Sequence, residues 1–282
     1  MQEISTLPEV SRRSLLQGSA GLVFSLAVTA QGVVLAQDVK KYGADSMPGG
    51  TVDDPLVFVS IAADGLVTIV AHRAEMGTGV RTSLPMVVAD ELEARWDKVS
   101  VVQAQGIESK YGNQNVDGSR SVRHFFAPMR RVGAAARQML EAAAAARWGV
   151  PVAQVKAVQH EVIHTPSGKR FSYGELAADA AQQAVPKGDA LRLKNPAAFR
   201  YIGKGKLAVV DLADIGRGKA VYGQDKHLPG MVYAVVARPA VLGAQLRSAQ
   251  KDKALAVPGV KALVDIPAYK GAPAFQPLGG VA

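Results

Sequence analysis

The sequence predicts an α+β fold, and three observations carry that prediction. Two short runs of alternating apolar residues flank a turn at 63–65, which is the pattern of a β-hairpin. Apolar residues from Leu84 onward recur with helical spacing and place one apolar stripe along a helix. An alanine-rich run over 129–149 favours a second, longer helix, and Gly149 marks its end.

Length and composition limit the possible functions. The chain has 282 residues, of which 48% are hydrophobic, enough to bury the core of one large or two smaller domains. The formal charge is +9, but Lys and Arg are scattered and aromatic residues make up 6%, so we expect no nucleic-acid binding. Cysteine is absent, which excludes disulfides, thiolate zinc sites and cysteine-ligated iron–sulfur clusters from this polypeptide.

Residues 1–37 are typical of an export signal. Paired arginines in the segment 11–16 precede a mildly apolar stretch that Gln17 and Gln31 interrupt, and small residues at 34–36 offer a peptidase site. This is the pattern of a twin-arginine signal, which exports folded proteins, commonly with a cofactor already bound. A membrane-spanning helix is the alternative, because about 20 apolar residues suffice to cross a bilayer. We therefore expect a periplasmic protein.

A joint rich in Gly, Pro and Asp, 38–56, leads into the predicted hairpin. Alternating residues define its two strands: Val57, Val59 and Ile61, then Leu66, Thr68 and Val70. The hairpin runs into a glycine loop, Glu75–Gly79. The next helix is expected to begin close behind Gly79, because Pro85 fits only in a first turn. A further strand is predicted from Lys98.

A second glycine loop precedes the alanine-rich helix. The polar segment 105–123 contains Gly118, Ser119, Arg120 and Ser121 at the expected helix N-terminus. Unpaired backbone N–H groups and the positive end of the helix dipole make such a position an anion site. Alternatively, Ser119 and Ser121 merely cap the helix and the glycines merely turn the chain. Because the same device occurs twice, we favour a phosphate-bearing or polar-headed ligand.

Familiar nucleotide and metal motifs do not match. The segment 77–82 has two glycines of a dinucleotide fingerprint, but Thr82 replaces the third, and 216–220 lacks the spacing of a Walker loop. The histidines are dispersed without metal-ligand spacing: His72, His124, His160, His164 and His227. We therefore name no catalytic or metal-ligating residue, and we interpret Glu75 as an exposed or helix-end carboxylate.

The second half of the chain predicts a further hairpin over 157–172. A capping box formed by Ser172 and Glu175 opens a helix over 173–184, since the serine is followed three residues later by a glutamate. The polar segment 187–212, which shows little periodicity, is interpreted as a linker between two domains.

Residues 213–282 are predicted to form a separate small unit. A strand begins at Met231, a helix spans 251–256, and another strand begins at Val260. The domain organisation is therefore a signal, a linker, a first domain over 57–186, a second linker and this unit.

Five segments carry a resemblance to a known family: EMGTGVRTSLPMVVADELEARWDKVSV, DGSRSVR, RRVGAAARQMLEAAAAARWGV, SYGELA and YGQDKHLPGMVYAVVARP. Together they resemble the molybdenum-binding large subunit of the xanthine oxidase superfamily, in particular its exported branch of the isoquinoline 1-oxidoreductase beta-subunit and aldehyde dehydrogenase type. The resemblance implies the N-terminal part of a molybdenum-cofactor-binding domain over 57–186, followed by the start of an α/β hammerhead-like domain over 213–282.

The resemblance also implies an activity. Members of this family are molybdenum hydroxylases that use a molybdenum-pterin dinucleotide, usually the cytosine form, to oxidise aldehydes or N-heteroaromatic compounds with oxygen from water. Electrons pass to a separate small iron–sulfur subunit and, in exported members, to a c-type cytochrome subunit that can hold the enzyme at the membrane. The absence of cysteine agrees with this division of labour, since the clusters then belong to another chain.

Carried over by position, the resemblance implies that both glycine loops contact the cofactor. The implied cofactor-binding residues are Gly77, Thr78, Gly79, Gly118, Ser119, Arg120 and Ser121. The glycines would let backbone approach the ligand closely, and Arg120 could pair with phosphate. One departure weakens the match, because Thr78 stands where the family usually carries glutamine, and threonine forms fewer hydrogen bonds.

The catalytic glutamate of the family lies several hundred residues further along than this chain extends, so we expect a fragment, a split gene product or a truncated reading frame that is inactive alone. Two hypotheses remain open. The first is the N-terminal part of an exported molybdenum hydroxylase. The second is a non-catalytic exported binding protein, or an inactive remnant of the same fold.

Overall fold

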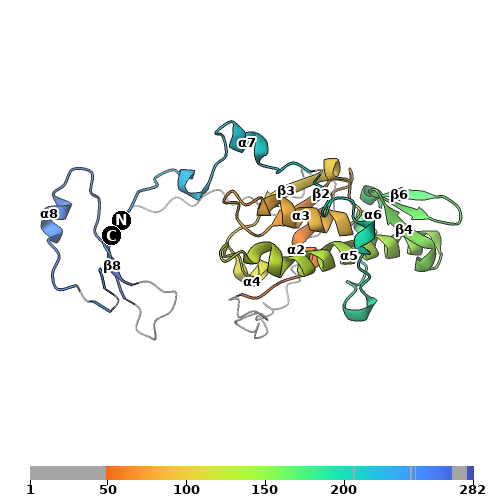
Figure 1. The fold of residues 1–282 in the computed structure, drawn as a ribbon, viewed down its shortest axis with the longest axis horizontal. Coiled ribbons are helices and arrows are strands. Elements are labelled where there is room, and N and C mark those ends of the chain that lie inside the picture. Colours follow the sequence, from red (N-terminus) through yellow and green to blue (C-terminus); the bar gives the residue numbers. More distant parts are fainter. Residues whose placement is uncertain (1–48, 206, 242, 245, 269–277) are drawn as a thin grey trace, which may run out of the picture. The chain divides into compact units, whose positions relative to one another are not determined.

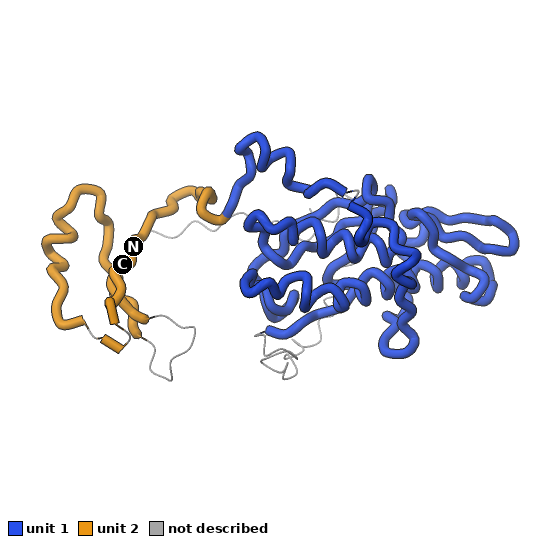
Figure 2. The backbone as a smooth tube through the Cα atoms, in the orientation of Figure 1, with its two compact units in different colours: residues 1–222 blue, residues 223–282 orange. Residues whose placement is uncertain are grey.

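The computed structural model describes residues 49–205, 207–241, 243–244, 246–268 and 278–282. These residues form two compact units, the first ending at Tyr222 and the second beginning at Gly223 (Figure 2). The predicted signal over 1–37 and most of the predicted joint over 38–56 lie outside the described residues. The two units are therefore described separately.

A three-stranded sheet organises the first part of unit 1. It consists of β1 (Val59–Ile61), β2 (Val67–Ala71) and β3 (Val99–Gln103), in the order β1-β2-β3. β1 and β2 pair antiparallel, which confirms the predicted hairpin, whereas β2 and β3 pair parallel. Parallel pairing requires a crossover, and α3 (Val80–Glu91) provides it (Figure 1).

The first predicted strand begins later than expected. Val57, predicted to lie in the strand, belongs to a short helix, α2 (Pro55–Phe58). The helix forms because the Asp54 side chain accepts the N–H of Leu56 at 2.9 Å and a proline occupies the first helical position. The alternation of apolar residues is thus preserved only from Val59 onward.

The helix behind the first glycine loop begins where predicted but differs in detail. α3 starts directly after Gly79, whose φ of 74° places it in the left-handed region. The prediction that Pro85 lies in the first turn is wrong, because it is the sixth residue of α3. The helix also ends before Trp96, which lies in the 3-10 turn η1 (Trp96–Lys98). Burial of the apolar face within unit 1 outweighs the hydrogen bond that proline removes.

A 29-residue helix, α5 (Arg120–Trp148), forms the centre of unit 1, beside α3 (Figure 1). It begins earlier than the alanine-rich run and ends, as predicted, at Gly149, with φ 65°. The two helices approach closely at Gly133, where an added Cβ would lie 2.4 Å from the carbonyl oxygen of Val88. Large buried side chains in the core of unit 1 include Phe58, Ile61, Ile69, Leu92, Phe125, Met129, Met139 and Leu140.

A second sheet packs near the C-terminal end of α5. Its strands are β4 (Val155–Val158), β5 (Glu161–His164) and β6 (Arg170–Ser172), all antiparallel. The predicted hairpin corresponds to β5 and β6, and β4 extends it. α6 (Tyr173–Ala180) follows, and its Ser172/Glu175 capping box is confirmed. The remaining short elements of unit 1 are α4 (Glu108–Tyr111), η2 (Val152–Gln154), η3 (Gly188–Ala190), η4 (Pro196–Ala198) and α7 (Leu212–Gly216).

Part of the segment interpreted as a linker is bound to α3 by hydrogen bonds and an ion pair. The Nζ of Lys194 lies 2.8 Å from Oδ1 of Asp90, a fully buried residue. The same carboxylate accepts the backbone N–H groups of Tyr201 and Ile202, each at 2.9 Å. The chain around 190–202 therefore belongs to the packed structure of unit 1, whereas the predicted domain boundaries stay predictions.

Unit 2 contains η5 (Gly223–Asp225), α8 (Lys251–Leu255), β7 (Asp265–Ile266) and β8 (Gly280–Val281). The helix is confirmed. The strand predicted from Met231 is wrong for the described residues, because that run forms only a single bridge, between Ala237 and Val281. The strand predicted from Val260 is confirmed in part, since it begins later, as β7, and pairs antiparallel with β8. Apolar side chains in this segment stay exposed, Val235 by 88%.

Candidate functional site

The two glycine loops lie at the same end of unit 1. Arg73 lies two residues after the end of β2 and precedes the first loop. Its Nε donates to Oγ of Ser121, in the first turn of α5, at 3.0 Å. Further along, Arg130 of α5 donates to Glu91, the last residue of α3, at 2.7 Å. α3 and α5 therefore run in the same direction, and their N-termini meet where β2 ends.

Arg73 holds this end together. Its Nη1 donates to the carbonyl oxygen and to Oδ1 of Asn113, both at 2.6 Å, and its Nη2 donates to the carbonyl oxygen of Asn115. The guanidinium lies 5.1 Å from the ring centre of Phe125 and the residue is 1% exposed. No described carboxylate forms an ion pair with it. Burial lowers the pKa of Arg73, and the nearby Asp117 partly opposes that shift.

His72, the neighbour of Arg73, carries a buried imidazole. It is 1% exposed, and its ring packs edge-on between those of Phe58 and Phe125, with ring centres 5.2 Å and 4.3 Å away, respectively. Within the described part of the chain, neither ring nitrogen has a hydrogen-bond partner. Burial, together with the charge of Arg73, lowers the pKa of His72 to about 3, so the ring is neutral at physiological pH.

Glu75 occupies the donors of the first loop. Its Oε1 accepts the backbone N–H groups of Gly77 at 2.7 Å and Gly79 at 2.9 Å, and its Oε2 accepts that of Arg81 at 3.1 Å. Burial raises the pKa of Glu75, but the hydrogen bonds from the loop outweigh it and lower the pKa below its ordinary value. Glu75 is thus a helix-end carboxylate, as interpreted, and it fills the position predicted for a ligand anion.

The outward side of the first loop remains open. Gly77 is exposed and has a φ of 97°. Apart from its two chain neighbours, no described residue has an atom within 4 Å of the position that a Cβ would take. Thr78 is exposed beside it. Gly79 is half-buried, and a Cβ there would lie 3.7 Å from a methyl group of Val209. A ligand can therefore approach the backbone at Gly77 without a side chain intervening.

The second loop differs from the first. Gly118 has a φ of 50°, and Ser119 stands in the left-handed region with a φ of 54°. The interpretation of Ser119 as a side-chain cap is wrong, because its hydroxyl makes no capping hydrogen bond. Ser121 is engaged by Arg73, and Nε of Arg120 donates to Oδ1 of Asp117 at 2.9 Å. The structure thus gathers the predicted residues at one end, and their role in binding stays a prediction.

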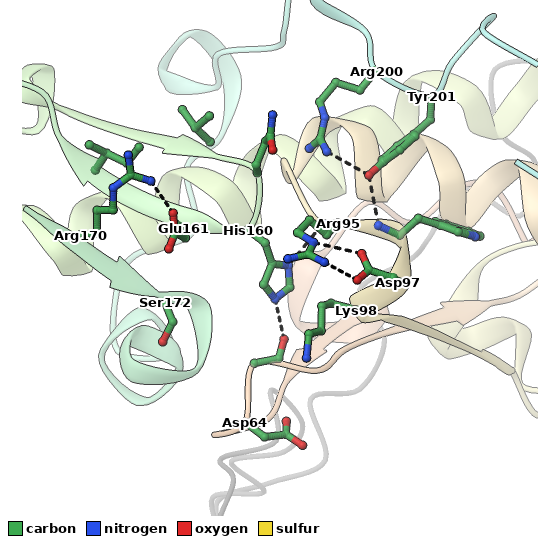
Figure 3. A pocket seen from close by; sticks show the side chains of 15 residues that line it. Asp64, Arg95, Asp97, Lys98, His160, Glu161, Arg170, Ser172, Arg200 and Tyr201 are labelled. Atoms are coloured by element: carbon green, nitrogen blue, oxygen red, sulfur yellow. Dashed lines mark hydrogen bonds and ion pairs between the residues drawn. The ribbon is translucent and has the colours of Figure 1, made fainter. Parts of the chain in front are cut away.

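A cavity of about 830 Å³ lies elsewhere, and the sequence did not predict it (Figure 3). Gly65, in the turn before β2, lines it, whereas the glycine loops follow β2, so the two regions lie at opposite ends of this strand. Among the lining residues Arg95 pairs with Asp97, and Arg170 with Glu161. Much of the charge of the cavity is therefore neutralised within its own walls.

Neither a membrane-spanning helix nor a metal site is found among the described residues. Over 49–205, 207–241, 243–244, 246–268 and 278–282, no helix is long and apolar enough to cross a membrane. Within the same residues, no group of His, Asp or Glu side chains is placed to hold a metal ion.

A glycine loop at a helix N-terminus is typical of an anion-binding position, and unit 1 has two of them at one end. The chain matches the molybdopterin cofactor-binding domain family over residues 22–206. It belongs to this family, that of the molybdopterin-binding subunits of the xanthine oxidase superfamily, which confirms the resemblance and the α+β fold class.

Curated relatives agree. The chain is 33% identical to the beta subunit of isoquinoline 1-oxidoreductase of Brevundimonas diminuta, over 79% of this chain and 33% of the relative. It is 32% identical to a membrane-bound aldehyde dehydrogenase (pyrroloquinoline-quinone) of Gluconacetobacter polyoxogenes, over 76% of this chain and 28% of the relative. It is 30% identical to a nicotinate dehydrogenase subunit of Pseudomonas putida, over 76% of this chain and 18% of the relative. The chain thus spans a third or less of the length of these relatives.

Among solved structures, the chain is similar to quinoline 2-oxidoreductase from Pseudomonas putida 86. The TM-score is 0.36 and the sequence identity 21%, over 47% of this chain and 17% of that one.

Proposed function

We propose that this chain supplies part of the cofactor cradle of an exported molybdenum hydroxylase, which oxidises aldehydes or N-heteroaromatic compounds with water as the oxygen source. The observation that carries the proposal is the buried hydrogen bond from Arg73 to Ser121, which links the segment just before the first loop to the first turn of α5. Membership of the molybdopterin-binding family gives this end of unit 1 its ligand class. The relatives are named for isoquinoline, aldehyde and nicotinate, which supports the substrate class.

The residues present fit a pterin dinucleotide in two respects. The exposed backbone at Gly77 faces open space, as close contact with a flat ring system requires. The buried charge of Arg73 has no ion-pair partner among the described residues, so this end of unit 1 is suited to an anionic pyrophosphate.

When bound, a molybdenum-pterin dinucleotide, which we propose to be the cytosine form, supplies the redox centre. In that assembly the chain's own residues bind and orient. Gly77, Thr78 and Gly79 form one wall, and Gly118, Ser119, Arg120 and Ser121 form the other. Arg120 contributes to phosphate binding only if its guanidinium leaves Asp117 or shares it, because the two are paired.

Partners and location belong to the same proposal. These 282 residues include no cysteine to ligate an iron–sulfur cluster, and two relatives are themselves named as subunits, which supports clusters on another polypeptide. We propose a small iron–sulfur subunit and a c-type cytochrome subunit as partners. Export to the periplasm by the twin-arginine route, with attachment to the membrane through a partner, completes the proposal.

A non-catalytic binding protein or an inactive remnant of the fold is the second candidate. One observation favours it: the amides of the first loop and the guanidinium of Arg120 are satisfied within the chain. Such loops keep their shape whether or not a cofactor is bound.

The deciding experiment isolates the native complex through a tag on this chain, from its own host. Metal analysis and identification of the nucleotide released from the pterin are expected to give about one molybdenum per chain and cytidine monophosphate. Aldehyde or heteroaromatic substrates should reduce an artificial electron acceptor, and oxygen-18 from labelled water should appear in the product. A complex that holds neither molybdenum nor pterin would favour the non-catalytic candidate.

A further inference from the structure

The carboxylate of Glu75 lies inside the first glycine loop, where it binds amides on both sides of the turn. Besides Gly77, Gly79 and Arg81, the N–H of Met76 donates to Oε1, at 3.1 Å. These amides belong to the approach to α3 and to its first turn, where donors have no partner within the helix. Glu75 therefore satisfies the donors that a bound phosphate would otherwise use.

The contrast with the second loop shows that this arrangement is specific. The N-cap residue of α5 is Ser119, whose side chain makes no capping hydrogen bond. The acidic residue near it, Asp117, is paired with Arg120. Of the two loops, the first is the one in which a carboxylate turns back onto the amides of its own turn. The two loops thus begin helices in the same direction but present different chemistry to a ligand.

We propose that Glu75 is a positioning residue that acts as an internal anion, closes the N-terminus of α3, and holds the Gly77–Gly79 loop in the shape that accepts the ligand. The ligand then meets the outward face of the loop, at Gly77 and Thr78, and the amide groups face inward. The nature of that ligand rests on the proposed function, whereas the closed loop itself does not.

Arg73 completes the arrangement on the other side. It lies two residues before Glu75 and holds the second loop through Asn113, Asn115 and Ser121. The segment from Arg73 to Glu75 therefore fixes both loops. The carboxylate of Glu75 accepts hydrogen bonds from the amides of the first loop, and the guanidinium of Arg73 donates hydrogen bonds to carbonyl and hydroxyl oxygens of the second. Both loops have these contacts in the chain alone, so little ordering remains when a ligand arrives.

Amide hydrogen exchange on the cofactor-free chain tests the internal contacts. Glu75→Ala should accelerate exchange at Gly77, Gly79 and Arg81 by at least about tenfold, the factor expected for lost hydrogen bonds to a charged group. Glu175→Ala is the matched control, because Glu175 also accepts an N–H at a helix start, that of Ser172 at 2.7 Å. It should leave those three amides unchanged. Unchanged exchange in Glu75→Ala would overturn the proposal.

In a second test, binding of inorganic pyrophosphate to the loop amides is expected in the variant and not in the wild type. The wild-type chain should show no shift of the loop amides in nuclear magnetic resonance spectra, because Glu75 occupies them. Glu75→Ala, or Glu75→Val if the alanine variant does not fold, should show shifts at these amides as pyrophosphate is added, because neither side chain carries an acceptor. Equal shifts in the wild type and the variant would mean that the amides are open to a ligand, and the proposal would be wrong.

The cofactor content of the native complex separates this inference from the proposed function. Glu75→Gln should lower the molybdenum content per chain by about tenfold, because a shifted loop no longer places Gly77 and Thr78 where the ligand contacts them. Glu175→Gln should retain the wild-type content. Retention of full molybdenum in Glu75→Gln would overturn the positioning role. If the wild-type complex itself held no molybdenum, the proposed function would fail, and the exchange and pyrophosphate results would still decide whether Glu75 closes the loop.

Discussion

The Nε of Arg73 donates a hydrogen bond to Oγ of Ser121 at 3.0 Å, across a sequence separation of 48 residues. This contact brings together two glycine loops that are far apart in the sequence. Because both residues are buried, the contact is screened little by water, and it fixes the relative position of the N-termini of α3 and α5. The family to which the chain belongs is defined by a molybdopterin cofactor-binding domain, and both loops lie within the matched residues.

Replacing Arg73 by methionine should destabilise unit 1 by about 3 kcal/mol, because the buried Asn113 and Ser121 lose the hydrogen bonds that the guanidinium donates to their oxygens. Urea unfolding followed by circular dichroism measures the effect. Arg73→Lys should recover only part of the loss, since an ammonium cannot reproduce the planar fork. A loss below about 0.5 kcal/mol would show that the network contributes little.

His72 should make stability depend on pH. Its folded pKa of about 3 lies below the ordinary value of 6.5, so below pH 6.5 the unfolded chain binds more protons than the folded chain. Stability is therefore lost as the pH falls from 6.5 towards 3. His72→Phe removes the proton-binding group and should lower the slope of unfolding free energy against pH by about 1.4 kcal/mol per unit between pH 6 and 4. Parallel slopes for the two proteins would contradict the assignment.

At neutral pH the same substitution should be neutral or stabilising. Phenylalanine fits the apolar surroundings formed by Phe58 and Phe125 and leaves no ring nitrogen without a partner. The measurement is the urea midpoint at pH 7.5. A loss of more than about 2 kcal/mol would contradict this prediction.

Gly133→Ala should destabilise the chain by about 2 to 3 kcal/mol, because the new methyl group would lie 2.4 Å from the Val88 carbonyl oxygen and would force α3 and α5 apart. Gly106→Ala is the control, since Gly106 has no left-handed φ and no atom within 4 Å of the position that its new methyl group would take. Thermal unfolding of both variants checks this prediction, and equal melting temperatures would disprove it.

Lys194→Met should cost about 3 kcal/mol, because the buried Asp90 would lose its ammonium partner, although the backbone N–H groups of Tyr201 and Ile202 remain. Limited proteolysis should then cut the segment near 187–205 first, as its attachment to α3 weakens. The exposed Lys156 on β4 provides the control Lys156→Met, for which no change is expected. Unaltered cleavage in Lys194→Met would show that the segment is held by other contacts.

Local signals in the sequence predicted local structure well. The hairpin turn at 63–65, the Ser172/Glu175 capping box and the end of α5 at Gly149 each depend on neighbouring residues, and each is confirmed. The position of Pro85 was misjudged because tertiary packing, which a local rule does not include, keeps α3 helical through it. Likewise, the chain around Lys194 has no periodicity, and only the buried carboxylate of Asp90 reveals why it packs.

At the candidate site too, features set by neighbouring residues were predictable from the sequence, whereas long-range contacts were not. Glycine and hydroxyl residues marked both loops in the sequence, because those residue types suit helix N-termini. The contacts of Arg73 with Asn113 and Ser121 join residues at least 40 positions apart, and no local pattern encodes them. The inward turn of Glu75 was equally hidden, although a carboxylate just before a glycine loop was the signal that could have suggested it.

The most direct test of the central claim, that the two loops form one cofactor cradle, compares two glycine variants in the native complex. Gly77 and Gly168 both have left-handed φ angles and open space around a potential Cβ, so valine causes similar strain at each. The measurement is molybdenum per chain. The account predicts a loss of about tenfold or more in Gly77→Val and full content in Gly168→Val. Equal content in both variants would contradict it.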